Sequence, residues 1–481
     1  MSTSPTHLAD APPAATTLLR ALFESQRAAF RRGAPDYAKR VAALRSLEAA
    51  VLDCKDEIVL ATNEDFGGRA RQETLLLELA PLVDAIRHTR KHLAGWMKLR
   101  RVSAGINFFP ARARIIYQPL GVVGILSAWN YQTLLSLSPL VDAIAAGNHA
   151  MVKPSEFAPK TAEVLQKMIA AIFPLDYVAV VTGDAQLASE FTSLPFDHLL
   201  FTGSTRVGKL VMKAASENLT PVTLELGGKC PAIVHSEFPL RTAVERILTG
   251  KLYNAGQTCL APDYVFVHES QRDELVRLAS EVAQQLYPKW SGNPDYTQII
   301  SAQHFERLDS YVRDAVARGA KAAPLGSPET PTISSDRSFT PVVLLDANDS
   351  MQVMREEIFG PILPVLTYRE PAEAWEYVNS HERPLALYYF DHNAGRIDHV
   401  LQNTISGGVT INDVIYHIAQ NNLPFGGVGA SGMGHYHGRA GFETFSKKKG
   451  VFLQSRFSTL KFLRPPYSPF TDRIIRFLLR K

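Results

Sequence analysis

The stretch PLGVVGILSAWN, residues 119–130, is followed by LLSLSPLVDAIAAGN, residues 134–148, and this pair sets the pattern of the chain. The first segment has the composition of a buried strand, and the second that of a helix that stops at Gly147. The alternation continues through HAMVKPSE, TAEVLQKMIAAIF, YVAVVTGD, QLASEFTS, DHLLFTG and VGKLVMKAASE, which ends at residue 217. Strands that alternate with helices over short connections predict a parallel sheet covered by helices.

The segments on either side of this set predict the remaining organisation. Apolar residues at helical spacing fill residues 17–99, and residues 101–118 alternate basic and apolar residues as an extended hairpin does. A second α/β set begins near Gly227, with strand candidates PAIVHS, YVFVHE, VVLLDAN and PILPVLTY. We therefore expect two α/β domains and an arm. Their predicted ranges are 1–100 with 119–226, 227–437, and 101–118 with 438–481.

The composition is typical of a soluble globular protein with more than one core. The chain has 481 residues, of which 46% are hydrophobic and 20% charged. The three cysteines, Cys54, Cys230 and Cys259, cannot form a disulfide framework, and no CxxC pair suggests a metal site. We therefore expect a reducing compartment and no metal. The N-terminus lacks the pattern of a signal peptide, and no apolar run approaches the ~18–20 residues of a spanning helix.

Positive charge is concentrated at the C-terminal end. Residues 452–481 carry seven Lys or Arg and one acid, whereas the formal net charge of the whole chain is +4. The body is therefore slightly acidic, which argues against a nucleic-acid surface. The tail TDRIIRFLLRK could form an amphipathic helix on a membrane surface. Alternatively, its apolar residues could pack on the protein itself, and we favour this second interpretation. These residues are Ile474, Ile475, Phe477 and Leu478.

Candidate site residues follow the predicted strands of the first set, where ligands of open α/β sheets bind. Asn130 follows the first strand, and Lys153 and Glu156 follow the second. The turn FTGSTRVG, residues 201–208, follows the fourth strand, and its backbone N–H groups favour a phosphate. Its spacing departs from GxGxxG, so a tight turn without a ligand stays an alternative.

Two further residues have side chains suited to catalysis. Glu225, in TLELGGK, stands at a strand end, where burial could raise the carboxyl pKa and make it a base, although a surface glutamate is an alternative. Cys259, in GQTCLAPDYVFV, stands where a loop meets a strand, among neighbours unlike those of a core cysteine. Its thiolate would be a nucleophile. Cys230, at the edge of an apolar strand, is interpreted as a core residue.

Six motifs in this order resemble the aldehyde dehydrogenase superfamily: WN at 129–130, KPSE at 153–156, FTGSTRVG at 201–208, LELGGK at 224–229, GQTC at 256–259 and EEIFGP at 356–361. The resemblance extends from about residue 20 to about residue 455. The segment LPFGGVGASGMGHYHGRAGFETFS, residues 423–446, is similar to the class-3-like branch, which includes coniferyl-aldehyde and fatty-aldehyde dehydrogenases. The implied fold is α/β, with a Rossmann-like parallel-sheet cofactor domain, a second α/β catalytic domain and a β-strand oligomerisation arm.

The resemblance also implies a role for each matching residue. Cys259 would be the nucleophile, Glu225 the general base, and Asn130 the side chain that holds the oxyanion together with the Cys259 backbone N–H. The implied cofactor contacts are Lys153 and Glu156 at the adenosine ribose, Gly203, Ser204, Thr205, Arg206, Val207 and Gly208 near the pyrophosphate, and Glu357 and Phe359 at the nicotinamide ribose.

The implied reaction is NAD(P)-dependent oxidation of an aldehyde to the carboxylic acid through a cysteine thiohemiacetal and thioester. We expect NAD, because Glu156 would repel the 2′-phosphate of NADP, while Lys153 would attract it and keeps NADP as a second cofactor. The branch implies an aromatic aldehyde such as coniferyl aldehyde, or a medium- or long-chain aliphatic aldehyde. It also implies a cytoplasmic homodimer.

Two other functions are alternatives. A cysteine-dependent, esterase-like hydrolase would use Cys259 and Glu225 without redox chemistry, but it would need neither the turn at 201–208 nor EEIFGP. A non-catalytic binding protein on the same fold would have no need of Cys259, Glu225 and Asn130 together. We therefore favour the dehydrogenase.

Overall fold

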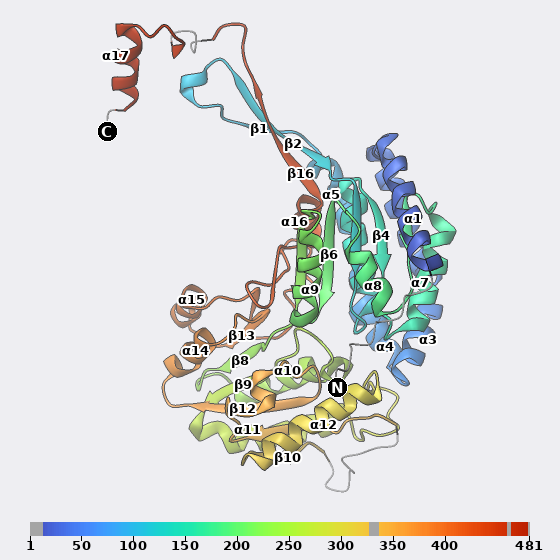
Figure 1. Ribbon diagram of the computed structural model, residues 1–481. Helices are drawn as coiled ribbons and strands as arrows, with labels where there is room; N and C mark the ends of the chain where they lie inside the picture. Colours follow the sequence, from blue (N-terminus) through green and yellow to red (C-terminus); the bar gives the residue numbers. More distant parts are fainter. Residues whose placement is uncertain (1–12, 327–335, 459–462, 480–481) are drawn as a thin grey trace, which may run out of the picture.

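The computed structural model describes residues 13–326, 336–458 and 463–479, and its strands form three sheets (Figure 1). Most of the N-terminal tail lies outside these ranges, as do Lys461, Arg480 and Lys481 of the basic C-terminal end. The described helices include none that is both long and apolar enough to cross a membrane.

The predicted parallel sheet of the first set is confirmed. Five parallel strands and one short antiparallel strand pair in the order β15-β7-β6-β3-β4-β5. The strands are β3 (Val122–Leu126), β4 (His149–Lys153), β5 (Val178–Val180), β6 (His198–Gly203), β7 (Val222–Leu226) and β15 (Gly432–Met433). The helices that join them are α6 (Gln132–Ala146), α7 (Pro159–Ile172), α8 (Ala185–Thr192) and α9 (Thr205–Ser216).

The N-terminal region is helical, as its apolar spacing predicts, and most of it packs on the helices of this sheet. Helices α2 and α5 pack on α6, and α3 packs on α7. One turn between α4 and α5 has π-helical hydrogen bonding, a local widening that is frequent at functional sites. The elements are α1 (Pro13–Arg31), α2 (Tyr37–Asp53), α3 (Lys55–Phe66), α4 (Arg71–Thr74), the π-helix η1 (Leu75–Leu79) and α5 (Ala80–Trp96).

The second sheet has seven strands in the order β10-β11-β12-β9-β8-β13-β14, parallel except for β10. The strands are β8 (Pro231–Val234), β9 (Tyr264–His268), β10 (Lys321–Pro324), β11 (Val342–Leu345), β12 (Ile362–Tyr368), β13 (Ala386–Phe390) and β14 (Gly408–Ile411). The longer helices around it are α10 (Leu240–Leu252), α11 (Arg272–Leu286), α12 (Ala302–Ala317), α14 (Pro371–Ser380) and α15 (Ala394–Asn403). Short turns are η3 (Tyr253–Gly256), η4 (Glu269–Gln271) and α13 (Gln352–Arg355). The buried strand β13 was not among the strands predicted from the sequence.

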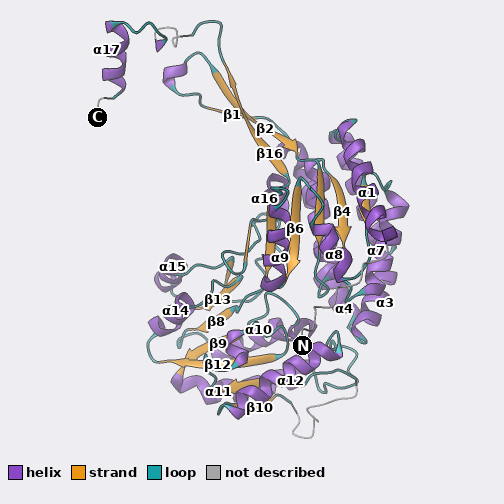
Figure 2. Cartoon of the chain, viewed as in Figure 1, coloured by secondary structure: helices purple, strands orange, loops and turns teal. Residues whose placement is uncertain are grey.

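A narrow three-stranded antiparallel sheet extends away from the body (Figure 2). Its strands are β1 (Arg100–Val102), β2 (Arg112–Pro119) and β16 (Ser446–Leu453), and the short helix η2 (Ile106–Phe108) lies between the first two. The hairpin predicted at 101–118 is therefore confirmed. Strand β16 pairs with β2 over its whole length, and it follows helix α16 (Gly438–Thr444).

The C-terminal helix α17 (Pro469–Leu478) stands beyond the tip of this narrow sheet (Figure 1). Its Phe477 side chain is 72% exposed, and Ile475 and Leu478 are exposed as well. The favoured interpretation, that these side chains pack on the protein itself, is wrong for the single chain, because Ile475, Phe477 and Leu478 are exposed. Membrane contact of the tail stays a prediction.

The predicted domain ranges also stay a prediction. Strand β15, at residues 432–433, pairs with β7 of the first sheet, so the chain returns to that sheet a few residues before 438. The arrows of β4 and β6 point toward the second sheet (Figure 1). The carboxyl ends of these strands therefore face the part of the chain that carries Cys259 and EEIFGP.

Candidate active site

A cavity of about 680 Å³ lies where the ends of β6 and β7 meet the loops of the second sheet. It brings together residues from segments that are far apart in the sequence. Nine of the thirteen predicted site residues line it: Asn130, Gly203, Ser204, Thr205, Arg206, Glu225, Cys259, Glu357 and Phe359.

Asn130 is held against the loop that leads to Cys259. It is buried in the loop between β3 and α6, and its Nδ2 donates to the Gln257 carbonyl at 3.1 Å. The residues that follow these two make a similar contact, because the Tyr131 and Thr258 hydroxyls lie 2.8 Å apart. Gly256 has a φ of 73°, and a Cβ there would collide with the Gly360 carbonyl. The loop thus needs glycine at position 256, where it passes close to the Gly360 backbone.

Glu225 is a buried acid at the end of β7. It is 1% exposed, and its Oε1 has no hydrogen-bond partner within the described ranges. Burial and, second, the Glu357 charge together raise its pKa to about 8. Glu357 also has its pKa raised to about 8, by burial first and by Asp263 second. Gly227 permits this geometry, because a Cβ there would collide with the Glu357 carboxylate.

Cys259 lines the same cavity and is partly buried. Burial raises the pKa of its thiol well above the ordinary value, with further contributions from Glu225 and Glu357. The group is therefore a thiol near neutral pH until a nearby cation or proton acceptor favours the thiolate. Cys230 is fully buried, and its Sγ donates to the Cys259 carbonyl at 3.3 Å, so its interpretation as a core residue is confirmed.

The turn between β6 and α9 opens onto the cavity through its first half only. Ser204 caps α9 by accepting a hydrogen bond from the Val207 N–H at 3.4 Å. Val207 and Gly208 belong to the helix and are not among the residues that line the cavity. The first turn of α9 presents backbone N–H groups, which suit an anion.

Lys153 and Glu156 lie at the carboxyl end of β4, two strands away from β6 in the same sheet, and outside the lining of the cavity. Lys153 ends β4 beside Leu126 of β3. It is 1% exposed, and its Nζ lies 3.0 Å from Glu156 Oε2. Glu156 is partly exposed, so this ion pair joins a buried ammonium to a carboxylate at the surface.

Several residues that shape the cavity were not predicted as site residues from the sequence. Arg307, on α12, donates at 3.4 Å to the carbonyls of both Glu357 and Phe359. The Trp129 ring packs edge-on against His304 and Phe359, with ring centroids 5.2 Å and 5.4 Å apart. Arg307 and His304 lie on an ordinary amphipathic helix, so no local signal marks them. Trp129 is part of the quoted WN motif.

The cavity has features that fit a dinucleotide. Three buried polar atoms of lining residues have no hydrogen-bond partner in the part of the chain that is described: Thr202 Oγ1, Glu225 Oε1 and Glu357 Oε1. Buried polar groups are normally paired, so these atoms suit a polar ligand. A carboxylate such as Glu357 is an acceptor for ribose hydroxyls. The cavity also runs from the α9 N-terminus to Cys259, which joins an anion site to a nucleophile.

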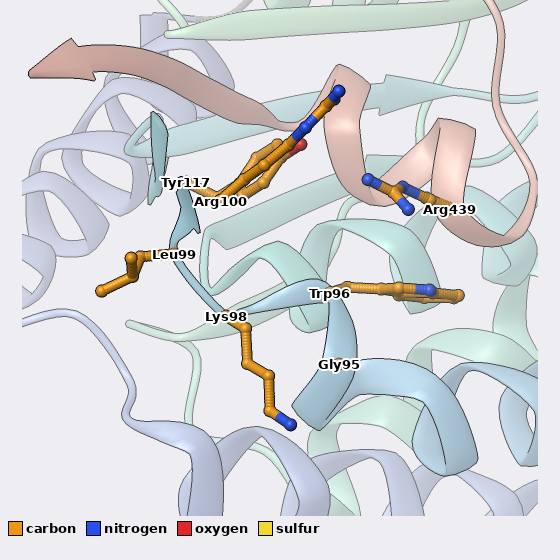
Figure 3. A pocket seen from close by; sticks show the side chains of 7 residues that line it. All are labelled: Gly95, Trp96, Lys98, Leu99, Arg100, Tyr117 and Arg439. Carbon is orange, nitrogen blue, oxygen red and sulfur yellow. The ribbon is translucent and has the colours of Figure 1, made fainter. Parts of the chain in front are cut away.

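A second cavity, of about 450 Å³, lies at the base of the narrow sheet (Figure 3). Its lining includes Trp96, Tyr117 and Arg439 and none of the predicted site residues. The Arg439 guanidinium is paired with Glu443, with Nε 3.0 Å from Oε1. This cavity is lined by no acid and no thiol, so the first cavity is the candidate active site.

Comparison with known proteins agrees with the geometry. The model of the aldehyde dehydrogenase family matches residues 3–451. A Pseudomonas aeruginosa protein named "Probable coniferyl aldehyde dehydrogenase" is 48% identical over 458 residues, which cover 95% of each chain. The coniferyl aldehyde dehydrogenase of a Pseudomonas species is 43% identical over 98% of each chain. The structure of the substrate-bound state of Staphylococcus aureus AldH superposes with a TM-score of 0.89 at 36% identity, covering 96% of this chain and 99% of that one.

Proposed function

Because the chain belongs to the aldehyde dehydrogenase family and oxidises an aldehyde with NAD(P), we propose that Cys259, Asn130 and Glu225 carry this chemistry. The support for the proposal is that these three side chains line one cavity together with the β6–α9 turn and Glu357. A nucleophile, an oxyanion donor and a base are the groups that the reaction requires.

Cys259 is proposed as the nucleophile. Its thiolate adds to the aldehyde carbonyl carbon and forms a tetrahedral thiohemiacetal, whose oxygen carries negative charge. Collapse of that adduct expels the aldehyde hydrogen as hydride and leaves a thioester on the sulfur. A bound nicotinamide dinucleotide supplies the hydride acceptor. Since burial disfavours the thiolate of Cys259 in the free protein, the positive nicotinamide ring would also favour ionisation.

Asn130 is proposed to act before the hydride leaves, and Glu225 after it. Asn130 Nδ2 and the Cys259 backbone N–H would hold the adduct oxygen, which lowers the barrier to adduct formation. The Asn130 amide has two hydrogens, and its contact with Gln257 uses one of them. Glu225 would then take a proton from water as that water attacks the thioester. Its pKa of about 8 suits this role, and so does its Oε1, which has no hydrogen-bond partner among the described residues.

For the cofactor, we propose NAD, with NADP as a second cofactor. Lys153 and Glu156 are proposed at the adenosine ribose, the turn at 203–208 at the pyrophosphate, and Glu357 with Phe359 at the nicotinamide ribose. The exposed carboxylate of Glu156 would repel a 2′-phosphate, while the Lys153 ammonium is already paired with it at 3.0 Å.

For the substrate, we propose an aromatic aldehyde such as coniferyl aldehyde, with medium- or long-chain aliphatic aldehydes as the alternative class. The names of the two Pseudomonas relatives support this choice. We also propose a cytoplasmic homodimer, because the arm sheet exposes strand edges that a second subunit would cover. Size-exclusion chromatography with light scattering tests the dimer, and a monomer would contradict it.

The function is tested by following the absorbance of the reduced cofactor with coniferyl aldehyde, octanal, benzaldehyde and acetaldehyde, each with NAD and with NADP. We expect the fastest turnover with NAD and coniferyl aldehyde. If the protein releases acid from an ester but forms no reduced cofactor with any of the aldehydes, the esterase-like hydrolase is indicated instead. A protein that binds cofactor but turns over none of the four aldehydes would indicate a binding protein.

A further inference from the structure

A buried cluster of one arginine and two glutamates lies behind the loops that carry Asn130 and Cys259. The Arg69 side chain is 0% exposed, and its Nη1 lies 2.8 Å from Glu78 Oε1. Its Nε lies 3.9 Å from Glu73 Oε2. The guanidinium carbon also lies 5.1 Å and 5.0 Å from the ring centroids of Phe66 and Tyr131. A charge buried this deeply destabilises the folded state unless it is paired, so the position of Arg69 depends on its two glutamates.

The cluster contacts the backbone of Asn130 directly. Arg69 Nη1 donates to the Asn130 carbonyl at 3.3 Å, and Asn254 Nδ2 donates to the same oxygen at 3.1 Å. Asn254 Nδ2 also donates to the Gln257 carbonyl, which is the acceptor of the Asn130 side chain. One small hydrogen-bond network therefore holds both the backbone carbonyl and the side-chain amide of Asn130.

The two glutamates tie this network to the segments on either side. Glu78 Oε2 accepts from the Thr133 N–H at 3.0 Å, in the first turn of α6 that follows Asn130. Glu73 accepts from the Asn254 N–H at 3.1 Å and from the Thr297 hydroxyl at 2.7 Å. Arg69 therefore lies between Glu78, which binds the segment after Asn130, and Glu73, which binds the loop that leads to Cys259.

We propose that Arg69 is a positioning residue for the oxyanion site, holding Asn130 so that its Nδ2 and the Cys259 backbone N–H point at the same place. The inference rests on the proposed function of Asn130. Donors must lie about 2.7–3.1 Å from the developing oxyanion, so a small shift of the Asn130 backbone weakens their effect. Arg69 itself touches neither the substrate nor the cofactor in this scheme.

The test is the substitution Arg69→Lys, which keeps the charge but loses the planar fork and the ring stacking. We expect kcat per folded enzyme to fall about tenfold, with NAD affinity unchanged. The matched control is Arg71→Lys, two residues further along, where the side chain is half exposed and pairs with Asp56. This control should keep both kcat and the thermal unfolding midpoint.

A double-mutant cycle with Asn130→Ala separates positioning from a general structural role. If Arg69 acts through Asn130, Arg69→Lys should change kcat less than about twofold once Asn130 is alanine. An equal loss in both backgrounds would overturn the inference. If Asn130→Ala alone keeps full turnover, the proposed role of Asn130 fails instead, and the two failures are distinguished.

If Arg69→Lys does not fold, Glu78→Gln carries the same test. The amide keeps an acceptor for the Thr133 N–H but weakens the anchor of Arg69. We expect the same loss of kcat and the same lack of additivity with Asn130→Ala. Full kcat in a folded Glu78→Gln enzyme would contradict the inference.

Discussion

Glu225 and Glu357 come from different sheets, and their carboxyl groups interact electrostatically inside one cavity. Glu225 ends β7, whereas Glu357 lies in the loop before β12. After burial, the Glu357 charge is the second cause of the raised pKa of Glu225. Two buried acids with pKa values of about 8 share at least one proton near neutral pH. Glu225, the base proposed for thioester hydrolysis, is therefore ionised more readily when the pH rises or when Glu357 is neutral.

Hydrolysis of the acyl-enzyme should accelerate as the pH rises through about 8, because only the ionised Glu225 accepts a proton. An activated ester can acylate Cys259 without any cofactor, so the release of acid can be followed on its own. Glu357→Gln should move the midpoint to lower pH, since it removes a repelling charge. An unchanged midpoint would show that Glu357 has no influence on the base.

The same pair should make the protein less stable at high pH. Their folded pKa values are raised, so the folded state binds protons more tightly than the unfolded chain. The stabilisation is complete below the ordinary glutamate pKa and is lost as the pH rises through about 8. Thermal unfolding at about pH 6 and about pH 9 should show a smaller fall in midpoint for Glu357→Gln than for the unsubstituted protein. Equal falls would argue against buried ionisation at this site.

Asn130→Ala should lose about two to three orders of magnitude in turnover while it still binds NAD. The substitution removes one proposed oxyanion donor and leaves the β6–α9 turn intact. Steady-state rates measure the loss, and fluorescence titration with NADH measures binding. Full turnover would rule out the oxyanion role.

Glu225→Gln should accumulate the thioester, because the nucleophile remains but the proposed base is gone. Mass spectrometry of enzyme quenched during turnover should find the acyl group on the peptide that contains Cys259. The steady-state rate should fall as the acyl-enzyme accumulates. If no acyl-enzyme builds up and the rate is unchanged, another group is the base.

Glu156→Gln should raise the ratio of kcat/KM for NADP to that for NAD, by about tenfold, because it removes a carboxylate that would repel the 2′-phosphate. The Lys153 ammonium, now without its charged partner, would be free to attract that phosphate. Glu163→Gln, at an exposed position of α7, is the matched control and should leave the ratio unchanged. An unmoved ratio in Glu156→Gln would place the ribose elsewhere.

The sequence by itself determined the class of fold and nine of the residues that line the candidate cavity. Apolar periodicity depends on neighbours along the chain, so it predicted the parallel sheet, the helices that cover it and the hairpin at 101–118. The ordered motifs predicted Asn130, Glu225, Cys259 and Glu357, which line one cavity. The roles assigned to them remain predictions.

Only the tertiary structure decided which distant surfaces meet. Amphipathicity gave α17 an apolar face but could not say what covers it, and the predicted packing on the same chain was wrong. The pairing of β16 with β2, and the contacts of Arg307 and Arg69 with loops far along the chain, depend on how whole elements pack. The raised pKa of Glu225 has the same origin, because desolvation is a property of the folded surroundings rather than of neighbouring residues in the sequence.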